Sequence, residues 1–308
     1  MKRVLVIWNP MAGRVGVEAA VHQAARVFEE RGWQARVEKS QSGEHVTRLA
    51  QEAAAQAFDA VFVAGGDGSL GRAVAGLIDQ PIPGANTALG VLPTGTANVW
   101  AREIGLPVSQ RNQITESAER LAAGHVQGMD VGVCNGRPFL FWAGFGLDGR
   151  VVDQLERNRS RFVKRWNEIY YLWTILQCSA RWGGVRMQVQ ADDQQVEGKF
   201  MLAVAGNIQR YAGGLARLSP EAVWNDGKME LWLFGGGRKV GTGMAIRHLW
   251  NLGWGRHVRD RHMVCLPFQH LKMTFSAEEW MQLDGEPWGT VREAEINIKR
   301  EAVRVLVP

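Results

Sequence analysis

The chain is poor in cysteine and tyrosine and has no long uninterrupted hydrophobic run. Of its 308 residues, only three are Cys and three are Tyr. Cys134, Cys178 and Cys265 are far apart and odd in number, which fits neither a disulfide framework nor a zinc site and favours a reducing cytoplasm. The apolar stretch 169–180 is about half the length needed to cross a bilayer. We therefore expect a cytoplasmic protein that is not integral to a membrane.

The bulk composition is that of a globular protein with a mild basic excess. Hydrophobic residues make up 46% and charged residues 22%, and the length fits two modest domains. The net charge of +5 suits nucleic acid, an anionic membrane or a phosphorylated substrate, and does not choose among them. The chain also has 13 Trp residues, a type that favours both cores and membrane interfaces.

Strand-like and helical patterns alternate over the first part of the chain. Strands are predicted near residues 4–8, 33–37, 60–64 and 88–92, with helices of 3.6-residue periodicity between them. This alternation predicts a parallel sheet with helices on its faces, in which ligands gather at the carboxyl ends of the strands. The segments that begin at Asn9, Gly65 and Pro93 should therefore lie at one edge of the sheet.

The pattern changes after about Val126. Strand-like runs then dominate, and one basic and aromatic helical segment, Arg161–Gln177, interrupts them. We expect a second, mostly β domain in this part of the chain. The strand-like runs lie at residues 129–133, 138–142, 185–189, 200–205 and 229–234.

The segment Gly65-Gly66-Asp67-Gly68-Ser69 is the most suggestive motif. It follows an apolar strand and precedes a helical pattern, so bare backbone N–H groups would face outward and suit a phosphate chain. The alternative is a tight strand-to-helix turn with a capping Ser. Asp67 is then either a metal contact or a turn residue. The residues Thr94 and Thr96, which flank Gly95, cap the next helix, contact a nucleotide, or do both.

Two later segments carry carboxylates in ambiguous settings. Asp284 and Glu286 would point to the same face of an extended backbone, where each raises the proton affinity of the other toward that of a useful base. The alternative is a hairpin turn, for which Asp-Gly is a common signal. Asp226-Gly227 is likewise a turn signal or part of a site for a hard cation.

Five motifs occur one after another along the chain. Together with Asn207 and the segment Tyr211-Ala212-Gly213-Gly214, they resemble the diacylglycerol kinase catalytic-domain family, particularly its bacterial soluble lipid kinases; sphingosine and ceramide kinases belong to the same group. The motifs are Asn9-Pro10 with Gly13, the loop 65–69, Pro93–Asn98 with Arg102, Asn225-Asp226-Gly227, and Asp284-Gly285-Glu286-Pro287.

The resemblance implies an α/β N-terminal domain with a parallel sheet like that of NAD kinases and phosphofructokinases. It also implies a C-terminal, mostly β sandwich-like domain, with the active site in the interdomain cleft. The final strands would return to the first domain. The expected division is residues 1–126 plus 290–308 for the nucleotide-binding domain and 127–289 for the lipid-substrate domain.

The same resemblance implies an ATP-dependent lipid kinase that uses Mg²⁺, with a lipid substrate, possible peripheral contact with an anionic membrane such as the inner membrane surface, and no nucleic acid. Glu286 would be the general base, with Asp284 and Asp67 as further catalytic residues. Magnesium would bind Asp226 and backbone carbonyls near Val223 and Lys228. The nucleotide-binding residues would be Asn9, Ser40, Gly65, Gly66, Asp67, Gly68, Ser69, Thr94, Gly95, Thr96 and Asn98.

Three departures from the family pattern leave alternatives open. The family usually has Asn-Asp at Asn98-Val99 and often Asn-Glu at Gly71-Arg72, while Ser69 replaces a commoner Thr. The alternatives are a soluble kinase of the NAD kinase type, which shares the GGDG loop, and a non-catalytic regulator that binds nucleotide or lipid. The Asp284-Gly-Glu ending argues against the first, and intact Asp67 and Glu286 against the second.

A basic and aromatic segment, Arg157–Arg181, is a candidate for contact with a membrane surface. Cationic side chains attract anionic lipid, and Trp and Tyr favour the interface. The alternative is an amphipathic helix with its aromatic residues in the core and its charges in water. The side chains concerned are Arg157, Arg159, Arg161, Lys164, Arg165, Trp166, Tyr170, Tyr171 and Trp173.

Overall fold

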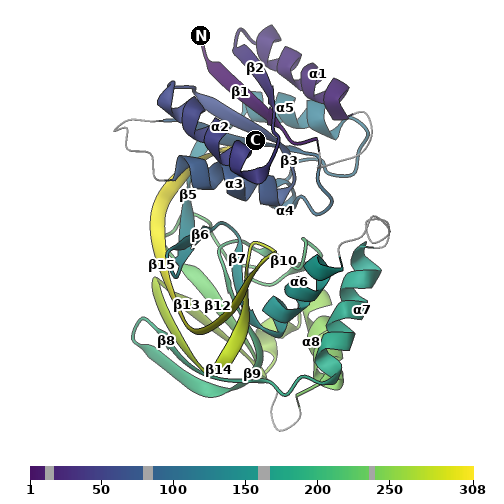
Figure 1. The fold of residues 1–308 in the computed structure, drawn as a ribbon, viewed down its shortest axis with the longest axis vertical. Helices are drawn as coiled ribbons and strands as arrows, with labels where there is room; N and C mark the ends of the chain where they lie inside the picture. Colours follow the sequence, from purple (N-terminus) through teal and green to yellow (C-terminus); the bar gives the residue numbers. More distant parts are fainter. Residues whose placement is uncertain (11–16, 79–85, 159–166, 236–239) are drawn as a thin grey trace. The chain divides into compact units, whose positions relative to one another are not determined.

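The computed structural model divides into two compact units (Figure 1). Unit 1 comprises Met1–Asp130 and Arg300–Pro308, and unit 2 comprises Val131–Lys299. Both divisions lie later in the chain than the expected domain boundaries, because the long strands β5 (His125–Cys134) and β15 (Glu286–Val307) run through them. The structure describes residues 1–10, 17–78, 86–158, 167–235 and 240–308.

Unit 1 is built on a parallel sheet whose strands match the predicted segments. Its strands pair in the order β4-β3-β1-β2, and the end of β15 joins β4, where Val305 faces Leu89. Strands β1, β3 and β4 are almost wholly apolar and buried, as expected for strands covered on both faces, whereas β2 is polar and partly exposed. Their bounds are β1 Arg3–Trp8, β2 Gln34–Lys39, β3 Ala60–Gly65 and β4 Ala88–Pro93.

Among the described residues, five helices accompany this sheet, and the four longer ones each bury one face. In α1, for example, Val21, Ala24 and Phe28 recur at helical spacing and are buried. Helix α1 packs with α5, and α2 packs with α3 (Figure 1). The helices are α1 Val17–Glu30, α2 Gly43–Ala55, α3 Asp67–Leu77, α4 Val99–Glu103 and α5 Gln113–Ala123.

The register of the parallel strands brings their carboxyl ends to one level. Trp8 faces both Lys39 and Ala64, and Gly65 faces Pro93. The segments that leave β1, β2, β3 and β4 therefore start side by side at the same edge of the sheet. This arrangement gathers the candidate residues of unit 1.

Unit 2 is a mostly antiparallel β structure around one apolar core. Strands β7 and β8 both lie between the long strands β9 and β14, and β12 and β13 extend the sheet beyond β9. Strand β8 alternates buried and exposed residues, so that one face packs into the core. The bounds are β6 Arg137–Phe139, β7 Trp142–Gly146, β8 Val185–Ala191, β9 Gln194–Gly206, β10 Arg210–Tyr211, β11 Ala216–Arg217, β12 Met229–Gly235, β13 Met263–Phe268 and β14 His270–Leu283.

In the described part of unit 2, three helices and a 3-10 turn, η2 (His257–Arg259), complete the fold. Helix α6 (Leu147–Arg157) packs on β14 and on α7 (Asn167–Ala180), and α7 packs on α8 (Thr242–Gly253). The sequence indicated one helical segment here, and α7 overlaps it. Helix α6 is not among the predicted segments, although Leu147, Val151 and Leu155 recur there every four residues. None of the helices described is long and apolar enough to cross a membrane.

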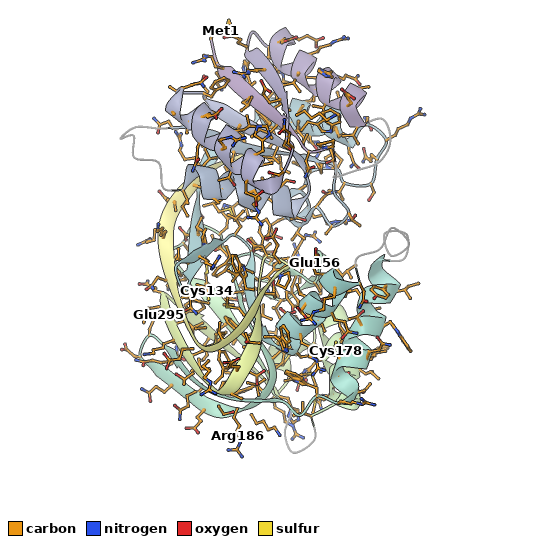
Figure 2. All side chains as sticks on the ribbon, in the orientation of Figure 1. Met1, Cys134, Glu156, Cys178, Arg186 and Glu295 are labelled. Atoms are coloured by element: carbon orange, nitrogen blue, oxygen red, sulfur yellow. The ribbon has the colours of Figure 1, made fainter. Side chains whose placement is uncertain are left out.

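All three cysteines are free thiols. Cys134 and Cys178, which are labelled in Figure 2, are buried, and Cys265 is exposed. Cys134 Sγ lies 3.8 Å from Met281 Sδ in the core of unit 2, and burial raises the pKa of its thiol to about 12. At neutral pH Cys134 therefore stays protonated and behaves as a small core residue.

Close packing between neighbouring strands yields a first prediction. A Cβ added at Gly90 in β4 would lie 2.5 Å from the buried ring of Phe62 in β3, so Gly90→Ala should destabilise the fold by about 1–3 kcal/mol. Gly71→Ala is the matched control, because it points into open space within α3 and should be neutral or slightly stabilising. Urea denaturation measures both, and equal stabilities of the two variants would contradict the packing argument.

Candidate functional site

The two glycine loops of unit 1 touch each other through their backbones. A Cβ on Gly95 would lie 2.6 Å from the Cα of Gly66, so only glycine fits at this approach. The N–H of Thr94 donates to the carbonyl of Gly65 at 3.1 Å, which continues the pairing of β3 and β4 past their last residues. The loops 65–69 and 93–98 therefore form one surface at the carboxyl edge of the sheet.

Asp67 ties these two loops together. Its carboxylate accepts the backbone N–H of Val99 at 3.0 Å and of Trp100 at 3.2 Å, at the start of α4. Desolvation of the carboxylate raises the pKa of Asp67, although the two N–H groups and Arg102 favour the charged form. The sequence offered a metal contact or a turn residue, and the structure places Asp67 in a loop-to-loop contact. Because Val99 contributes only its backbone N–H, the departure from the family pattern at this position preserves the contact.

Asn9 follows β1 and Ser40 follows β2, so both lie at the same carboxyl edge as the two glycine loops. Asn9 Nδ2 donates to Ser69 Oγ at 2.8 Å, so the first loop contacts the loop after β3. Ser40 is buried, and its hydroxyl donates to the carbonyl of Trp8 at 3.2 Å. Of the motif that begins at Asn9, residues 11–16 lie outside the described part of the chain.

The carboxyl edge of the unit 1 sheet also carries buried polar side chains and the first backbone N–H groups of α3. Thr94 Oγ1 and Asn98 Oδ1 are buried and have no hydrogen-bond partner among the described residues, while Asn98 Nδ2 holds the carbonyl of Gly95 at 2.8 Å. Gly68 and Thr96 are exposed. The first N–H groups of α3 have no partner within their helix, which is the arrangement that binds phosphate. This edge can therefore hold a phosphate chain, and the nucleotide roles stay a prediction.

In unit 2, the structure corrects the expected geometry of Asp284 and Glu286. Asp284 and Gly285 form a two-residue turn between β14 and β15, with φ of 50° and 83°, and Glu286 pairs with Leu283 as β15 begins. The two carboxylates do not lie on one face of an extended strand, because the chain reverses at Asp284. The hairpin that the sequence offered as the alternative is the observed structure.

The Asp284 carboxylate binds backbone N–H groups near the start of β7. It accepts the N–H groups of Leu140, Phe141 and Trp142 at 2.7, 2.8 and 3.1 Å. Three such bonds stabilise the anion and fix the hairpin against the start of β7. These bonds position the hairpin, and the catalytic roles of Asp284 and of half-buried Glu286 on the same hairpin stay predictions.

A chain of hydrogen bonds runs from this hairpin into the interior of unit 2. The N–H of Gly285 donates to Gln282 Oε1 at 2.7 Å, and Gln282 Nε2 donates to Asp148 Oδ2 at 2.7 Å. The hydroxyl of Tyr211 donates to the other oxygen of Asp148. Burial raises the pKa of Asp148, and the hydrogen bonds from Tyr211 and Gln282 partly offset this rise. We call Gly285, Gln282, Asp148 and Tyr211 the Asp148 chain.

The Asp148 chain ends at an apolar pocket inside unit 2. The pocket has a volume of about 60 Å³, comparable to two water molecules, and lies among α6, α7, α8, β9 and β12. Asp148, Tyr171 and Tyr211 place polar groups at its wall. The apolar lining is Leu147, Val151, Ile175, Met201, Leu202, Ala212, Phe234, Ala245, Leu249 and Leu252, with His248 beside them.

Sequence reasoning assigned no role to Asp148 or Gln282, and it named Tyr211 only as part of a motif. One local signal was available. The segment Phe145-Gly146-Leu147-Asp148 repeats the pattern around Asp67, in which a strand ends in glycine and an Asp stands in the first turn of the following helix. A Cβ on Gly144 would lie 1.7 Å from Asp148 Oδ2, so this glycine is also required by the site.

The predicted magnesium position lies in a turn before β12. Asp226 is exposed, and its Oδ1 accepts the N–H of Lys228 at 2.9 Å, while Gly227 has a φ of 78°. Within the described residues its second oxygen makes no hydrogen bond, and Val223 is exposed nearby in sequence. A hard cation fits a carboxylate oxygen beside backbone carbonyls at such a turn. The geometry agrees with both of the roles that the sequence left open.

The candidate membrane segment Arg157–Arg181 divides between solvent and core. Trp173 is exposed, Tyr171 lines the pocket, and Arg157 pairs with Asp153 at 2.8 Å. This distribution suits an amphipathic helix with one aromatic face inward. Arg159, Arg161, Lys164, Arg165 and Trp166 lie outside the described residues.

The Glu279 carboxyl on β14 also has a shifted pKa, which gives a pH-dependent prediction. Burial raises the pKa of Glu279 from 4.5 to about 7, although Arg150 favours the charged form. A carboxyl with a raised folded-state pKa stabilises the fold fully below about pH 4.5 and loses that contribution as pH rises through 7. Glu279→Gln should therefore gain stability relative to the parent between pH 5 and pH 8.

Urea denaturation at the two pH values measures this gain. Glu278→Gln, which changes an exposed neighbour, is the control. A stability difference between Glu279→Gln and the parent that is the same at both pH values would contradict the prediction.

Comparison with known proteins assigns the chain to a family. The model of the diacylglycerol kinase catalytic domain matches residues 3–134, and that of the YegS C-terminal NAD kinase beta sandwich-like domain matches residues 142–307. The diacylglycerol kinase of Bacillus subtilis (strain 168) is 28% identical over this whole chain and 97% of its own length. That of Staphylococcus carnosus (strain TM300) is 23% identical over this whole chain and 95% of its own length.

Solved structures share the fold. A crystal structure of a diacylglycerol kinase from Bacillus anthracis str. Sterne covers the whole chain and 97% of that protein, with a TM-score of 0.75 at 20% identity. A second crystal structure from the same organism reaches a TM-score of 0.80 at 22% identity, with the same coverage. Because the two family models together span nearly the entire sequence, the protein belongs to the diacylglycerol kinase catalytic-domain family and is a lipid kinase.

Proposed function

We propose that the protein transfers the γ-phosphoryl group of ATP to a hydroxyl of an amphipathic, diacylglycerol-like lipid. The α/β domain binds the nucleotide, and the β-rich domain binds the lipid. The observation that carries the proposal is the Asp148 chain, because it connects an apolar pocket to the hairpin of Glu286. An apolar pocket with a few buried polar groups is the expected form of a lipid site.

The loops at the carboxyl edge of the unit 1 sheet would hold the phosphates of ATP. Phosphoryl transfer depends on positioning and on neutralising charge, and backbone N–H groups at the start of α3 supply both. The bonds from Asp67 to Val99 and Trp100 keep the loops in place, which is a positioning role. Thr96, which is exposed, would contact the nucleotide directly.

Magnesium fits the chemistry of this reaction as a counter-charge to the phosphates. At Asp226 and the backbone carbonyls near Val223 and Lys228, a magnesium ion would have a structural role. The exposed carboxylate of Asp226 and its second oxygen support that assignment.

The acceptor lipid would place its chains among α6, α7 and α8 and its hydroxyl toward the Asp148 chain. Since the pocket holds only about 60 Å³, an acyl chain enters when α7 and α8 shift away from β9. Glu286 would take the proton of the acceptor hydroxyl as general base. The bonds of Asp284 to residues 140–142 fix the hairpin on which Glu286 stands.

A turnover assay with Mg-ATP tests the proposal directly. The acceptors are diacylglycerol, ceramide, sphingosine and NAD, each presented with the same detergent where it is insoluble. Phosphorylation of a lipid supports the proposal. Phosphorylation of NAD alone, or nucleotide binding without turnover on any acceptor, would replace it with one of the two alternatives. Because ATP is a cytosolic metabolite, we place the reaction in the cytoplasm at the inner membrane surface.

The base assignment predicts a sharp contrast within one hairpin. Glu286→Gln should lower turnover by about 10²–10⁴-fold while leaving stability and ATP affinity unchanged. Asp284→Asn should instead destabilise the fold by about 1–3 kcal/mol, because its amide cannot accept all three N–H groups. Glu293→Gln, exposed on the same strand, is the control for turnover. Near-normal turnover of folded Glu286→Gln would exclude it as the base.

Filling the pocket should affect the lipid and not the nucleotide. Ala245 is buried in the pocket wall on α8, so Ala245→Leu should raise KM for a long-chain acceptor about tenfold and leave KM for ATP unchanged. Gly243→Ala is the control on the same helix, because its added Cβ meets open space. Equal changes in both KM values, or none for the lipid, would remove this pocket from the mechanism.

A further inference from the structure

Helix α8 has two apolar faces. Ala245, His248 and Leu252 are buried, and Ala245 and Leu252 line the pocket. Ile246, Trp250 and Trp254 recur every four residues from the helix to its C-cap and are 52%, 59% and 65% exposed. The rings of the two tryptophans lie 5.7 Å apart. Adjacent exposed Trp side chains are unusual on a protein surface and indicate an interaction site.

The exposed stripe continues onto the 3-10 turn η2, where Val258 is 56% exposed. Around it lies an open groove of about 880 Å³, lined by Trp254 and Val258 together with Arg256, Arg259 and Arg261. We call the stripe and this groove the α8–η2 face. It is defined by Ile246, Trp250, Trp254, Arg256, Val258, Arg259 and Arg261.

The charge of this face is uncompensated. Residues 242–261 contain four arginines and a single acidic residue, Asp260. Within the described residues Arg256, Arg259 and Arg261 form no ion pair, while Arg247 pairs with Asp260 at 2.9 Å. The Asp260 side chain is only 2% exposed, so it offers no negative charge to solvent. The face therefore combines apolar rings with unpaired cations.

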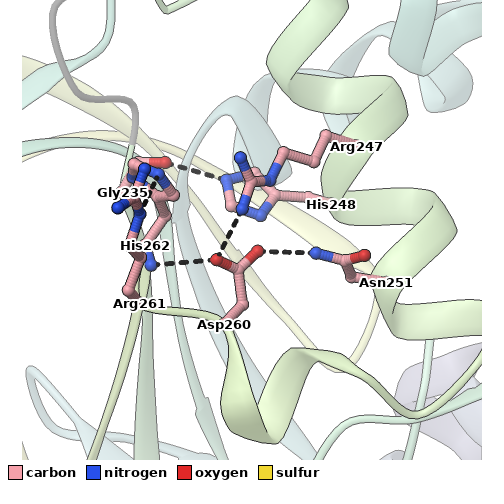
Figure 3. Close-up of polar contacts among 7 residues, drawn as sticks. All are labelled: Gly235, Arg247, His248, Asn251, Asp260, Arg261 and His262. Carbon is pink, nitrogen blue, oxygen red and sulfur yellow. Dashed lines mark hydrogen bonds and ion pairs between the residues drawn. The ribbon is translucent and has the colours of Figure 1, made fainter.

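A network beneath the surface holds the face in shape. Figure 3 shows Asp260 accepting from Arg247 and from Asn251, at 2.9 and 2.6 Å, and it also accepts the N–H of His262 at 3.0 Å. His248 bonds the carbonyl of Gly235 at 2.8 Å (Figure 3). These contacts join α8 to the chain around η2 and β13, so no rearrangement is needed to present the Trp and Arg side chains.

We propose that the α8–η2 face docks on an anionic lipid bilayer. Exposed Trp rings insert at the level of the headgroups, and Arg side chains pair with lipid phosphates. Charge complementarity favours an anionic surface, and a bilayer is favoured over a protein partner because the opposite face of the same helix lines the pocket. The purpose of docking rests on the proposed function, since a helix held at the bilayer would bring the pocket next to its lipid.

Sedimentation of the full-length protein with vesicles tests the proposal without nucleotide. The vesicles are phosphatidylcholine alone or with phosphatidylglycerol. Binding should rise with phosphatidylglycerol and fall with salt. Trp250→Ala with Trp254→Ala, and separately Arg256→Gln with Arg259→Gln, should each weaken binding by about tenfold or more. Arg26→Gln with Arg186→Gln removes two exposed charges elsewhere and should change binding less than twofold.

Three results would overturn the proposal. One is undiminished binding of both α8–η2 variants. Another is loss of binding in Trp173→Ala alone, which would move the docking surface to α7. A third is a change of oligomeric state in the Trp variants with no change in vesicle binding, which would make the face a contact between copies of the chain. Unfolding curves show that each variant is folded.

Turnover on a short-chain lipid in solution tests the proposed kinase reaction independently of docking on a bilayer. Failure to bind vesicles, with lipid turnover intact, would overturn the docking surface alone. Vesicle binding through these residues, without turnover on any lipid, would overturn the proposed reaction alone.

Discussion

The buried carboxyl of Asp148 is the point on which the arrangement of unit 2 depends. Its two oxygens accept from Tyr211 and Gln282, and Gln282 in turn holds the turn at Gly285. A carboxyl removed from water is costly unless its partners are in place, so these segments must assemble together. Gly144 leaves the space that Asp148 needs. The apolar pocket and the hairpin of Glu286 are therefore fixed by the same bonds.

Unit 1 also contains an aspartate that joins distant segments by hydrogen bonds. Asp67, in the first turn of α3, accepts two N–H groups at the start of α4, just as Asp148, in the first turn of α6, accepts from two separate segments. In each unit a strand ends in glycine and an aspartate contacts distant segments, the start of α4 in unit 1 and strands β10 and β14 in unit 2. Asp284 does so as well, with three N–H groups near β7. Asp67 and Asp284 thus hold distant backbone segments in place, and Glu286 is the carboxylate proposed as general base.

Helix α8 has one face in the interior of unit 2 and another face exposed to solvent. One face closes the apolar pocket, and the other exposes Trp250 and Trp254 beside arginines. An amphipathic helix usually buries its single apolar stripe, and a second stripe left in water is unfavourable unless a partner covers it. A bilayer would cover it and would also be the source of the acceptor.

The sequence by itself determined the alternating strands and helices of unit 1 and the gathering of Asn9, Gly65 and Pro93 at one edge. Both follow from local periodicity and from the order of parallel strands. The tertiary structure decided the rest. The partners of Asp284 lie about 140 residues away in the chain, at Leu140 and its neighbours, and Gln282 and Tyr211 reach Asp148 from separate strands. Whether Trp250 is core or surface depends on what packs over it. Local patterns carry no information about such partners, because hydrogen bonding and burial are set by residues that only folding brings together.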